Sequence, residues 1–229
     1  MTETHLTRSA LTRIVLVRYL EALLLLAAMF FLSAGTFAYW QAWLYLAMLF
    51  IPMAFVMAYL LKNDPELLER RMRFREKETA QKRIIGLSWL WFLLAFLLPG
   101  IDQRFGWSHV PVIIVLAAEL LVLLGYGIVV WVFRENSYAS RVIEVAQQQE
   151  VIDSGPYALL RHPMYAGAII MYIFSPLALG SWWAMIPALP IIPILILRIL
   201  NEEDILLRDL PGYADYRSKV RYRLLPGVW

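Results

Sequence analysis

Residues 155–167 read Gly-Pro-Tyr-Ala-Leu-Leu-Arg-His-Pro-Met-Tyr-Ala-Gly, a polar and aromatic cluster between long apolar runs. Arg198, Glu202 and Glu203 follow at the end of the last apolar run. Ionisable side chains at the ends of membrane helices indicate functional sites, because burying them in lipid is costly. If the two clusters meet on one side of a membrane, they form a site suited to a charged ligand.

The first cluster has the features of a helix start. Proline fits the first position of a helix, so Pro163 predicts a helix that begins there with His162 as its cap. The free N–H groups of a helix start attract carboxylates. Tyr165 would lie in the first turn, and the Gly-Pro turn would hold Tyr157 nearby. Gly167 would let a ligand or a neighbouring helix approach the backbone closely.

The second cluster is expected to lie at the same membrane face as the first. Arg198 and Glu202 are four residues apart, so they can share one helix face as an ion pair. Predicted helices at 163–180 and 182–199 would form a tight hairpin that turns at Gly180-Ser181, and equal lengths would bring the chain back to its starting membrane face. His162 and Glu203 would then share one pocket. Taken alone, each cluster could instead be a solvated helix cap.

The composition is that of a membrane protein. The 229 residues are 61% hydrophobic and 17% charged, whereas soluble domains have about 45–50% apolar and about 25% charged residues. The apolar residues gather into segments of roughly 17 to 25 residues, the length that spans a bilayer as a helix. The expected fold is all-α, a polytopic membrane helix bundle of about six transmembrane helices. Their predicted ranges are 13–35, 40–61, 84–99, 110–133, 163–180 and 182–199.

We expect one integral membrane domain over 1–229, with N-terminal membrane helices in 1–135 and a cofactor-binding region in 136–229. The tail, 209–229, is expected to include a cytoplasmic amphipathic helix. Eight Lys and Arg residues lie in 62–83 and six in 198–229. By the positive-inside tendency, both termini and the site would face the cytoplasm. The expected location is a bacterial inner membrane.

Other classes of site are disfavoured. The chain has no cysteine and three scattered histidines, so thiol nucleophiles and metal sites are not expected. Glu119, inside an apolar run, is either a functional group or a packed polar contact. The charged connection 63–83 is expected to be a headgroup-facing helix that starts after Pro65, or an entrance for an anionic lipid. No cleavable signal peptide is expected, because the first apolar run is too long.

Four motifs together resemble the isoprenylcysteine carboxyl methyltransferase family and related membrane methyltransferases, which include those that methylate phosphatidylethanolamine. The similar region covers about 136–226. The motifs are Gly155-Pro156-Tyr157, Arg161-His162-Pro163-Met164-Tyr165-Ala166-Gly167, Glu202-Glu203 and Pro211-Gly212-Tyr213-Ala214-Asp215-Tyr216. The resemblance implies an S-adenosylmethionine-dependent methyltransferase with its cofactor at the cytoplasmic ends of the last helices.

The resemblance also implies roles for individual residues. Arg198, offset by about one residue from the family's arginine, would contact the substrate, and Asn136 matches a polar position of the loop before the cofactor strip. The chain departs from the family at Gln149, where eukaryotic members carry histidine, and at Pro211, where phenylalanine is usual. The implied cofactor contacts are Gln149, Glu150, Val151, Ile152, Tyr157, His162, Pro163, Met164, Tyr165 and Glu203.

Methyl transfer of this kind needs orientation and no metal. A carboxylate acceptor would be oriented by Arg198, whereas an amine acceptor would need a base, Glu202 or Glu203. The expected partners are a lipophilic acceptor from the bilayer and membrane lipids, with no nucleic acid. The alternatives are an NADPH-dependent membrane reductase of the sterol-reductase kind, a small membrane transporter and a non-enzymatic scaffold.

Overall fold

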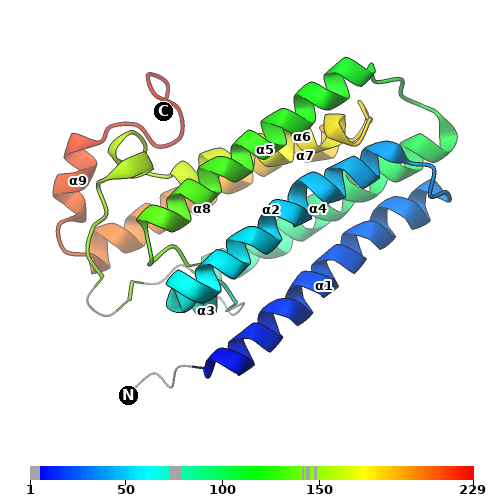
Figure 1. The fold of residues 1–229 in the computed structure, drawn as a ribbon. Helices are drawn as coiled ribbons and strands as arrows, with labels where there is room; N and C mark the ends of the chain where they lie inside the picture. The colour runs from blue at the N-terminus through cyan, green and yellow to red at the C-terminus, as the bar shows by residue number, and fades with distance from the viewer. Residues whose placement is uncertain (1–5, 73–78, 141, 143–144, 147–148) are drawn as a thin grey trace.

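The computed structural model describes residues 6–72, 79–140, 142, 145–146 and 149–229, without the side chains of 79–85 and 87. Within this part the chain is helical and contains no strand, which confirms the all-α prediction. Long helices run side by side as an elongated bundle (Figure 1). Four stretches are long and apolar enough to cross a membrane: α1 (Arg8–Ala34), α2 (Trp40–Asn63), α5 (Val112–Glu135) and Met185–Asp209.

The predicted count of six spans is not established. Helix α4 (Thr79–Phe105) extends beyond its predicted range 84–99 at both ends. Helix α6 (Pro163–Ala178) has 16 residues, fewer than the roughly 20 that a bilayer requires. The four apolar stretches nevertheless agree with the expectation of an integral membrane protein.

The predicted hairpin of 163–180 and 182–199 is wrong in its second half. After α6 the chain turns through Gly180, whose φ is 76°, and forms only the short helix α7 (Met185–Ala188). Helix α8 (Ile191–Asp209) then starts after Pro190 and continues ten residues beyond the predicted end at 199. Prolines delay the start of α8, because they cannot continue a helix from the preceding turn. Arg198 and the two glutamates therefore lie within α8.

The connection after α2 begins as predicted. Helix α3 (Pro65–Arg71) starts at Pro65, and the Asp64 side chain caps it by accepting a hydrogen bond from the Leu67 N–H at 2.9 Å. Part of the predicted connection 63–83 lies outside the described residues. In the tail, α9 (Tyr213–Lys219) is a helix of seven residues, and 220–229 is not helical. The predicted amphipathic helix is therefore short.

Helices α5 and α6 approach so closely that their backbones touch. A Cβ atom added to Gly167 would lie 2.6 Å from the Gly125 carbonyl oxygen, and one added to Gly125 would lie 2.6 Å from the Gly167 oxygen. The absence of a side chain at Gly167 therefore allows the close approach of α5. The contact fixes the start of α6 near the end of α5, at the end of the bundle where α3, α9 and the end of α8 also lie (Figure 1).

Candidate functional site

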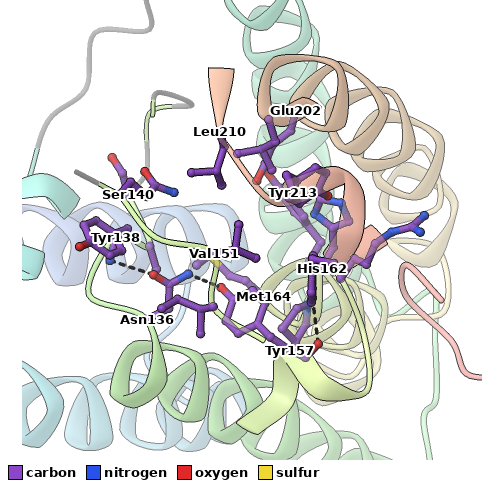
Figure 2. Close-up of a pocket in the computed structure, with 18 of the residues that line it drawn as sticks. Asn136, Tyr138, Ser140, Val151, Tyr157, His162, Met164, Glu202, Leu210 and Tyr213 are labelled. Carbon is purple, nitrogen blue, oxygen red and sulfur yellow. Dashed lines mark hydrogen bonds between the residues drawn. The ribbon is translucent and has the colours of Figure 1, made fainter. Parts of the chain in front are cut away.

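A pocket opens at this end of the bundle (Figure 2). It contains about 870 Å³ of space free of protein atoms, part of it open to solvent. Its walls come from the end of α5, the segment that follows, the start of α6, the end of α8 and the region of α9. It is lined by Asn136, Tyr138, Ala139, Ser140, Val142, Gln149, Glu150, Val151, Ile152, Tyr157, Arg161, His162, Pro163, Met164, Tyr165, Arg198, Glu202, Leu206, Leu210, Tyr213 and Tyr216.

All predicted site residues except Glu203 line this one pocket. The predicted residues that line the pocket are Asn136, Gln149, Glu150, Val151, Ile152, Tyr157, His162, Pro163, Met164, Tyr165, Arg198 and Glu202. Glu203 is buried beside this pocket but is not among its lining residues. Its predicted contact with the cofactor stays a prediction.

Asn136 and Tyr157 form one wall. Asn136 ends α5, where its Oδ1 accepts a hydrogen bond from the Tyr138 N–H at 2.8 Å and its Nδ2 donates to the Tyr157 hydroxyl at 2.9 Å (Figure 2). Burial raises the pKa of Tyr157 to about 12. The hydroxyl is therefore protonated at neutral pH. Because it accepts from Asn136, its own proton remains available to a ligand.

Local backbone chemistry places Tyr157 on this wall. It lies in a short 3₁₀ helix, η1 (Gly155–Ala158), which packs against α5. Gly155 has φ 55°, a left-handed conformation that favours glycine. A Cβ atom at this position would lie 2.6 Å from the Glu135 side chain. The Tyr216 hydroxyl donates to the Tyr157 carbonyl oxygen at 2.8 Å, which ties η1 to α9.

The α6 start matches its prediction. Pro163 is the first helical residue and His162 is the cap residue. The His162 side chain makes no capping hydrogen bond, since its ring nitrogen lies 3.2 Å from Glu203 Oε1. The predicted meeting of His162 with the returning glutamates is therefore present in the structure.

The Tyr165 hydroxyl connects Arg198 and Glu202, which were expected to form an ion pair. The Tyr165 hydroxyl donates to Glu202 Oε2 at 2.5 Å and accepts a hydrogen bond from Arg198 Nε at 2.9 Å. Arg198 and Glu202 are thus linked through the phenol, and all three side chains line the pocket. These three polar side chains connect the start of α6 to the part of the pocket wall that α8 forms.

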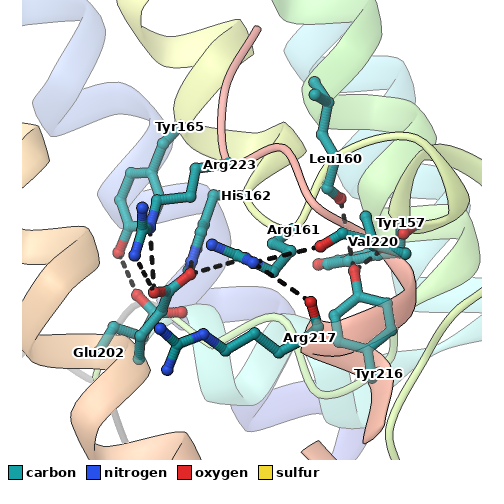
Figure 3. Close-up of polar contacts among 11 residues, drawn as sticks. Tyr157, Leu160, Arg161, His162, Tyr165, Glu202, Tyr216, Arg217, Val220 and Arg223 are labelled. Carbon is teal, nitrogen blue, oxygen red and sulfur yellow. Dashed lines mark hydrogen bonds and ion pairs between the residues drawn. The ribbon is translucent and has the colours of Figure 1, made fainter. Parts of the chain in front are cut away.

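Glu203 lies among the side chains of Arg161, His162 and Arg223. These three partners are labelled in Figure 3. The Glu203 side chain is 3% exposed. Arg161 Nε lies 2.8 Å and His162 Nε2 lies 3.2 Å from Oε1, while Arg223 donates to Oε2 from Nε at 3.0 Å and from a terminal nitrogen at 2.9 Å. Because this carboxylate is buried among its partners, removing any one charged partner would leave a buried charge uncompensated.

Sequence reasoning missed the contribution of the tail to this pocket. The Arg161 and His162 N–H groups donate to the carbonyl oxygens of Tyr222 and Arg223 at 2.9 and 3.0 Å. Tyr213 and Tyr216 line the pocket itself. Arg161 belongs to the motif that continues to Gly167, and this position could have indicated its place beside the pocket. Arg223 carried no such signal.

A second, mainly apolar cavity adjoins the first. It lies among α4, α6 and α8 and contains about 890 Å³ of space free of protein atoms, part of it open to the surroundings. Arg198 lines both cavities. The lining residues are Ser88, Trp89, Phe92, Tyr172, Ile191, Leu195 and Arg198. We refer to this cavity as the α4–α8 groove.

Glu119 lies outside both cavities. It is 1% exposed on α5, and its two carboxylate oxygens have no hydrogen-bond partner among the described residues. Among the described residues, Glu119 lines neither cavity.

Comparison with known proteins supports the motif assignment. The model of the phospholipid methyltransferase family matches residues 113–210, from the start of α5 to the end of α8. The matched region includes three of the four motifs, all but 211–216, and most of the pocket wall. The resemblance to the group of membrane methyltransferases is thereby confirmed. Among curated proteins, a comparison finds no match to this chain.

Proposed function

We propose that this chain, whose residues 113–210 match the model of the phospholipid methyltransferase family, transfers a methyl group from S-adenosylmethionine to a lipid-borne acceptor. The observation that carries the proposal is the position of Arg198, which lines both the polar pocket and the apolar α4–α8 groove. A water-soluble methyl donor fits the first cavity, and the chain of a lipid fits the second. Their reacting groups would meet at Arg198.

The residues of the pocket fit the methyl donor. S-adenosylmethionine supplies a methyl group on a positively charged sulfur and also carries a carboxylate and an amino group. Glu150 and Glu202 line the pocket and offer carboxylates to the cationic groups. The Tyr157 hydroxyl offers a proton, while Val151 and Ile152 provide apolar surface. These residues would bind and orient the donor.

The lipid acceptor would use the α4–α8 groove. Trp89, Phe92 and Leu195 give it an apolar lining, which suits an acyl or prenyl chain. Arg198 lies where the groove meets the pocket, and Glu202 lies one helical turn further towards the end of α8. A headgroup with an anionic group and an amine matches this order of charges. A terminal carboxylate would need only Arg198.

The chain's own groups account for the transfer step. The acceptor attacks the methyl carbon in line with the bond to sulfur, and correct orientation alone can accelerate such a reaction strongly. With an amine acceptor, Glu202 takes the proton that the nitrogen must lose, and the Tyr165 hydroxyl holds the Glu202 carboxylate in place. Glu203 is unsuited as a base, because its carboxylate is already held by Arg161, His162 and Arg223.

The test is methyl transfer by the purified protein in lipid vesicles. The protein is incubated with S-adenosylmethionine carrying an isotopically labelled methyl group, in vesicles with phosphatidylethanolamine, with a prenylated cysteine or with phosphatidylcholine alone. We expect label in one of the first two lipids and none with phosphatidylcholine alone. Arg198→Ala should abolish the transfer. Absence of both transfer and S-adenosylhomocysteine binding, with oxidation of NADPH instead, would favour a reductase.

A further inference from the structure

Tyr213 brings an unpartnered hydroxyl to the pocket. It is the first residue of α9, outside the matched family region, and it is 4% exposed. Tyr213 lines the pocket, but its hydroxyl oxygen is buried and has no hydrogen-bond partner among the described residues. Burying a hydroxyl without a partner costs free energy. In the wall of a pocket, such a group is a candidate contact for a ligand.

The other tyrosine that α9 contributes differs in this respect. Tyr216 also lines the pocket, and its ring centroid lies 5.7 Å from that of Tyr213. The Tyr216 hydroxyl donates to the Tyr157 carbonyl oxygen at 2.8 Å. That hydroxyl therefore has a structural role, whereas no contact among the described residues uses the Tyr213 hydroxyl.

Apolar contacts hold the Tyr213 ring in place. It packs with Leu210 in a buried cluster, against which Val151 and Leu206 also pack. These three residues line the pocket as well. The ring is thus part of an apolar wall, and Figure 2 shows Tyr213 on the side of the pocket where Glu202 lies.

The surroundings of the Tyr213 hydroxyl disfavour an anionic ligand group. Burial raises the pKa of Tyr213, the carboxylates of Glu203 and Glu202 raise it further, and the Arg161 charge lowers it. The hydroxyl is therefore protonated at neutral pH and can donate a hydrogen bond. Because two carboxylates lie nearby, a neutral acceptor suits this position better than the carboxylate of a ligand does.

We propose that the Tyr213 hydroxyl donates a hydrogen bond to a neutral acceptor atom in the nucleoside portion of the methyl donor, a ribose oxygen or an adenine nitrogen. The proposal rests on the proposed function, because it assumes that the pocket holds S-adenosylmethionine. The hydroxyl oxygen is covered in this structure, so a small rotation of the side chain accompanies the contact, a change that is common on binding. The tail would then bind and orient the donor directly.

Tyr213→Phe tests the proposal with two measurements, since it removes the hydroxyl and keeps the ring. The unfolding temperature without ligand should stay equal or rise, because an unpartnered buried hydroxyl is lost. The affinity for S-adenosylhomocysteine should fall about threefold to tenfold, the size of one neutral hydrogen bond. The affinity for 5′-methylthioadenosine, which has the nucleoside but lacks the amino-acid portion, should fall by the same factor. Isothermal titration in detergent or nanodiscs measures both affinities.

Two tyrosines of the tail serve as controls. Tyr216→Phe loses the hydrogen bond to the Tyr157 carbonyl oxygen, so its unfolding temperature should fall. Tyr222 does not line the pocket and is 38% exposed. Tyr222→Phe should therefore change neither the unfolding temperature nor the two affinities.

Unchanged affinity of the Tyr213→Phe protein for both ligands would overturn the proposal. A lower unfolding temperature of this variant would also overturn it, because the hydroxyl would then have a structural partner. A loss confined to S-adenosylhomocysteine would contradict the contact with the nucleoside and place it at the amino-acid portion. If the unaltered protein binds neither ligand, the proposed function itself fails.

Discussion

The Tyr165 hydroxyl lies 2.5 Å from Glu202 Oε2 and donates its proton to that oxygen. The phenol comes from the first turn of α6 and the carboxylate from α8, so the bond connects the two helices whose ends form the pocket. Arg198 donates to the same hydroxyl from one turn earlier on α8. The three groups form a polar bridge at the place where the pocket and the α4–α8 groove meet.

Tyr165→Phe removes this bridge with little change in volume. We expect the rate of methyl transfer to fall by about tenfold to a hundredfold, because Arg198 and Glu202 each lose a charge-assisted hydrogen bond. S-adenosylhomocysteine affinity should change by less than about threefold, which is within 1 kcal/mol. Turnover and titration with the same preparation measure the two effects.

Tyr19→Phe is the control for that substitution. The Tyr19 hydroxyl donates to the Phe50 carbonyl oxygen at 3.0 Å in the N-terminal helices, away from the pocket. It should leave turnover unchanged. A Tyr165→Phe protein with normal turnover would remove the bridge from the mechanism.

The adjacent glutamates should behave in opposite ways. Glu203→Gln leaves Arg161 and Arg223 beside a neutral amide in a buried place, and breaking a buried ion pair costs about 3–5 kcal/mol. Its unfolding temperature should therefore fall clearly. Glu202→Gln should leave the unfolding temperature nearly unchanged and lower the turnover of an amine acceptor. Thermal unfolding in detergent and turnover, measured on both variants, separate the two roles.

The opposite result for Glu203→Gln would change the role assigned to Glu203. If Glu203→Gln keeps the normal unfolding temperature but loses S-adenosylhomocysteine binding, then Glu203 contacts the cofactor as the family resemblance implies. The Glu203 cluster would in that case rearrange when the ligand binds.

The sequence predicted most of the pocket because its signals are local. Proline at the first helical position predicted the start of α6 at Pro163, and the contiguous motif placed His162 and Tyr165 correctly. The end of α8 could not be predicted in the same way. The apolar run stops near residue 199, but Glu202, Glu203 and the following leucines are good helix formers, so the helix continues to Asp209.

Contacts between distant segments were also beyond the sequence. Nothing near Arg223 indicates that it meets Glu203, because the contact depends on the tail pairing with residues 161 and 162. Arg71 and Met164, which are also in contact, are 93 residues apart in the chain. Such contacts follow from tertiary packing and not from spacing along one helix.

The close crossing of α5 and α6 predicts a difference between two glycines of α5. Gly125→Ala would place a Cβ atom 2.6 Å from the Gly167 carbonyl oxygen, whereas a Cβ atom at Gly127 meets nothing within 4 Å. We expect Gly125→Ala to destabilise the protein by about 1–3 kcal/mol, as overpacking does. Gly127→Ala should be neutral or slightly stabilising, because alanine favours a helix. Equal unfolding temperatures for the two variants would contradict the observed crossing.

The α4–α8 groove predicts a selective effect on the acceptor. Leu195 lines the groove, so Leu195→Trp should fill part of it and raise the KM for the lipid acceptor at least several-fold. S-adenosylhomocysteine affinity should stay unchanged, because Leu195 does not line the donor pocket. Leu197→Trp is the matched control, since Leu197 lies on the same helix but is 54% exposed. If both variants have the KM of the unaltered protein for the lipid, the acceptor chain does not bind in the α4–α8 groove. If Leu195→Trp weakens donor binding to the same extent, the two cavities act as one site.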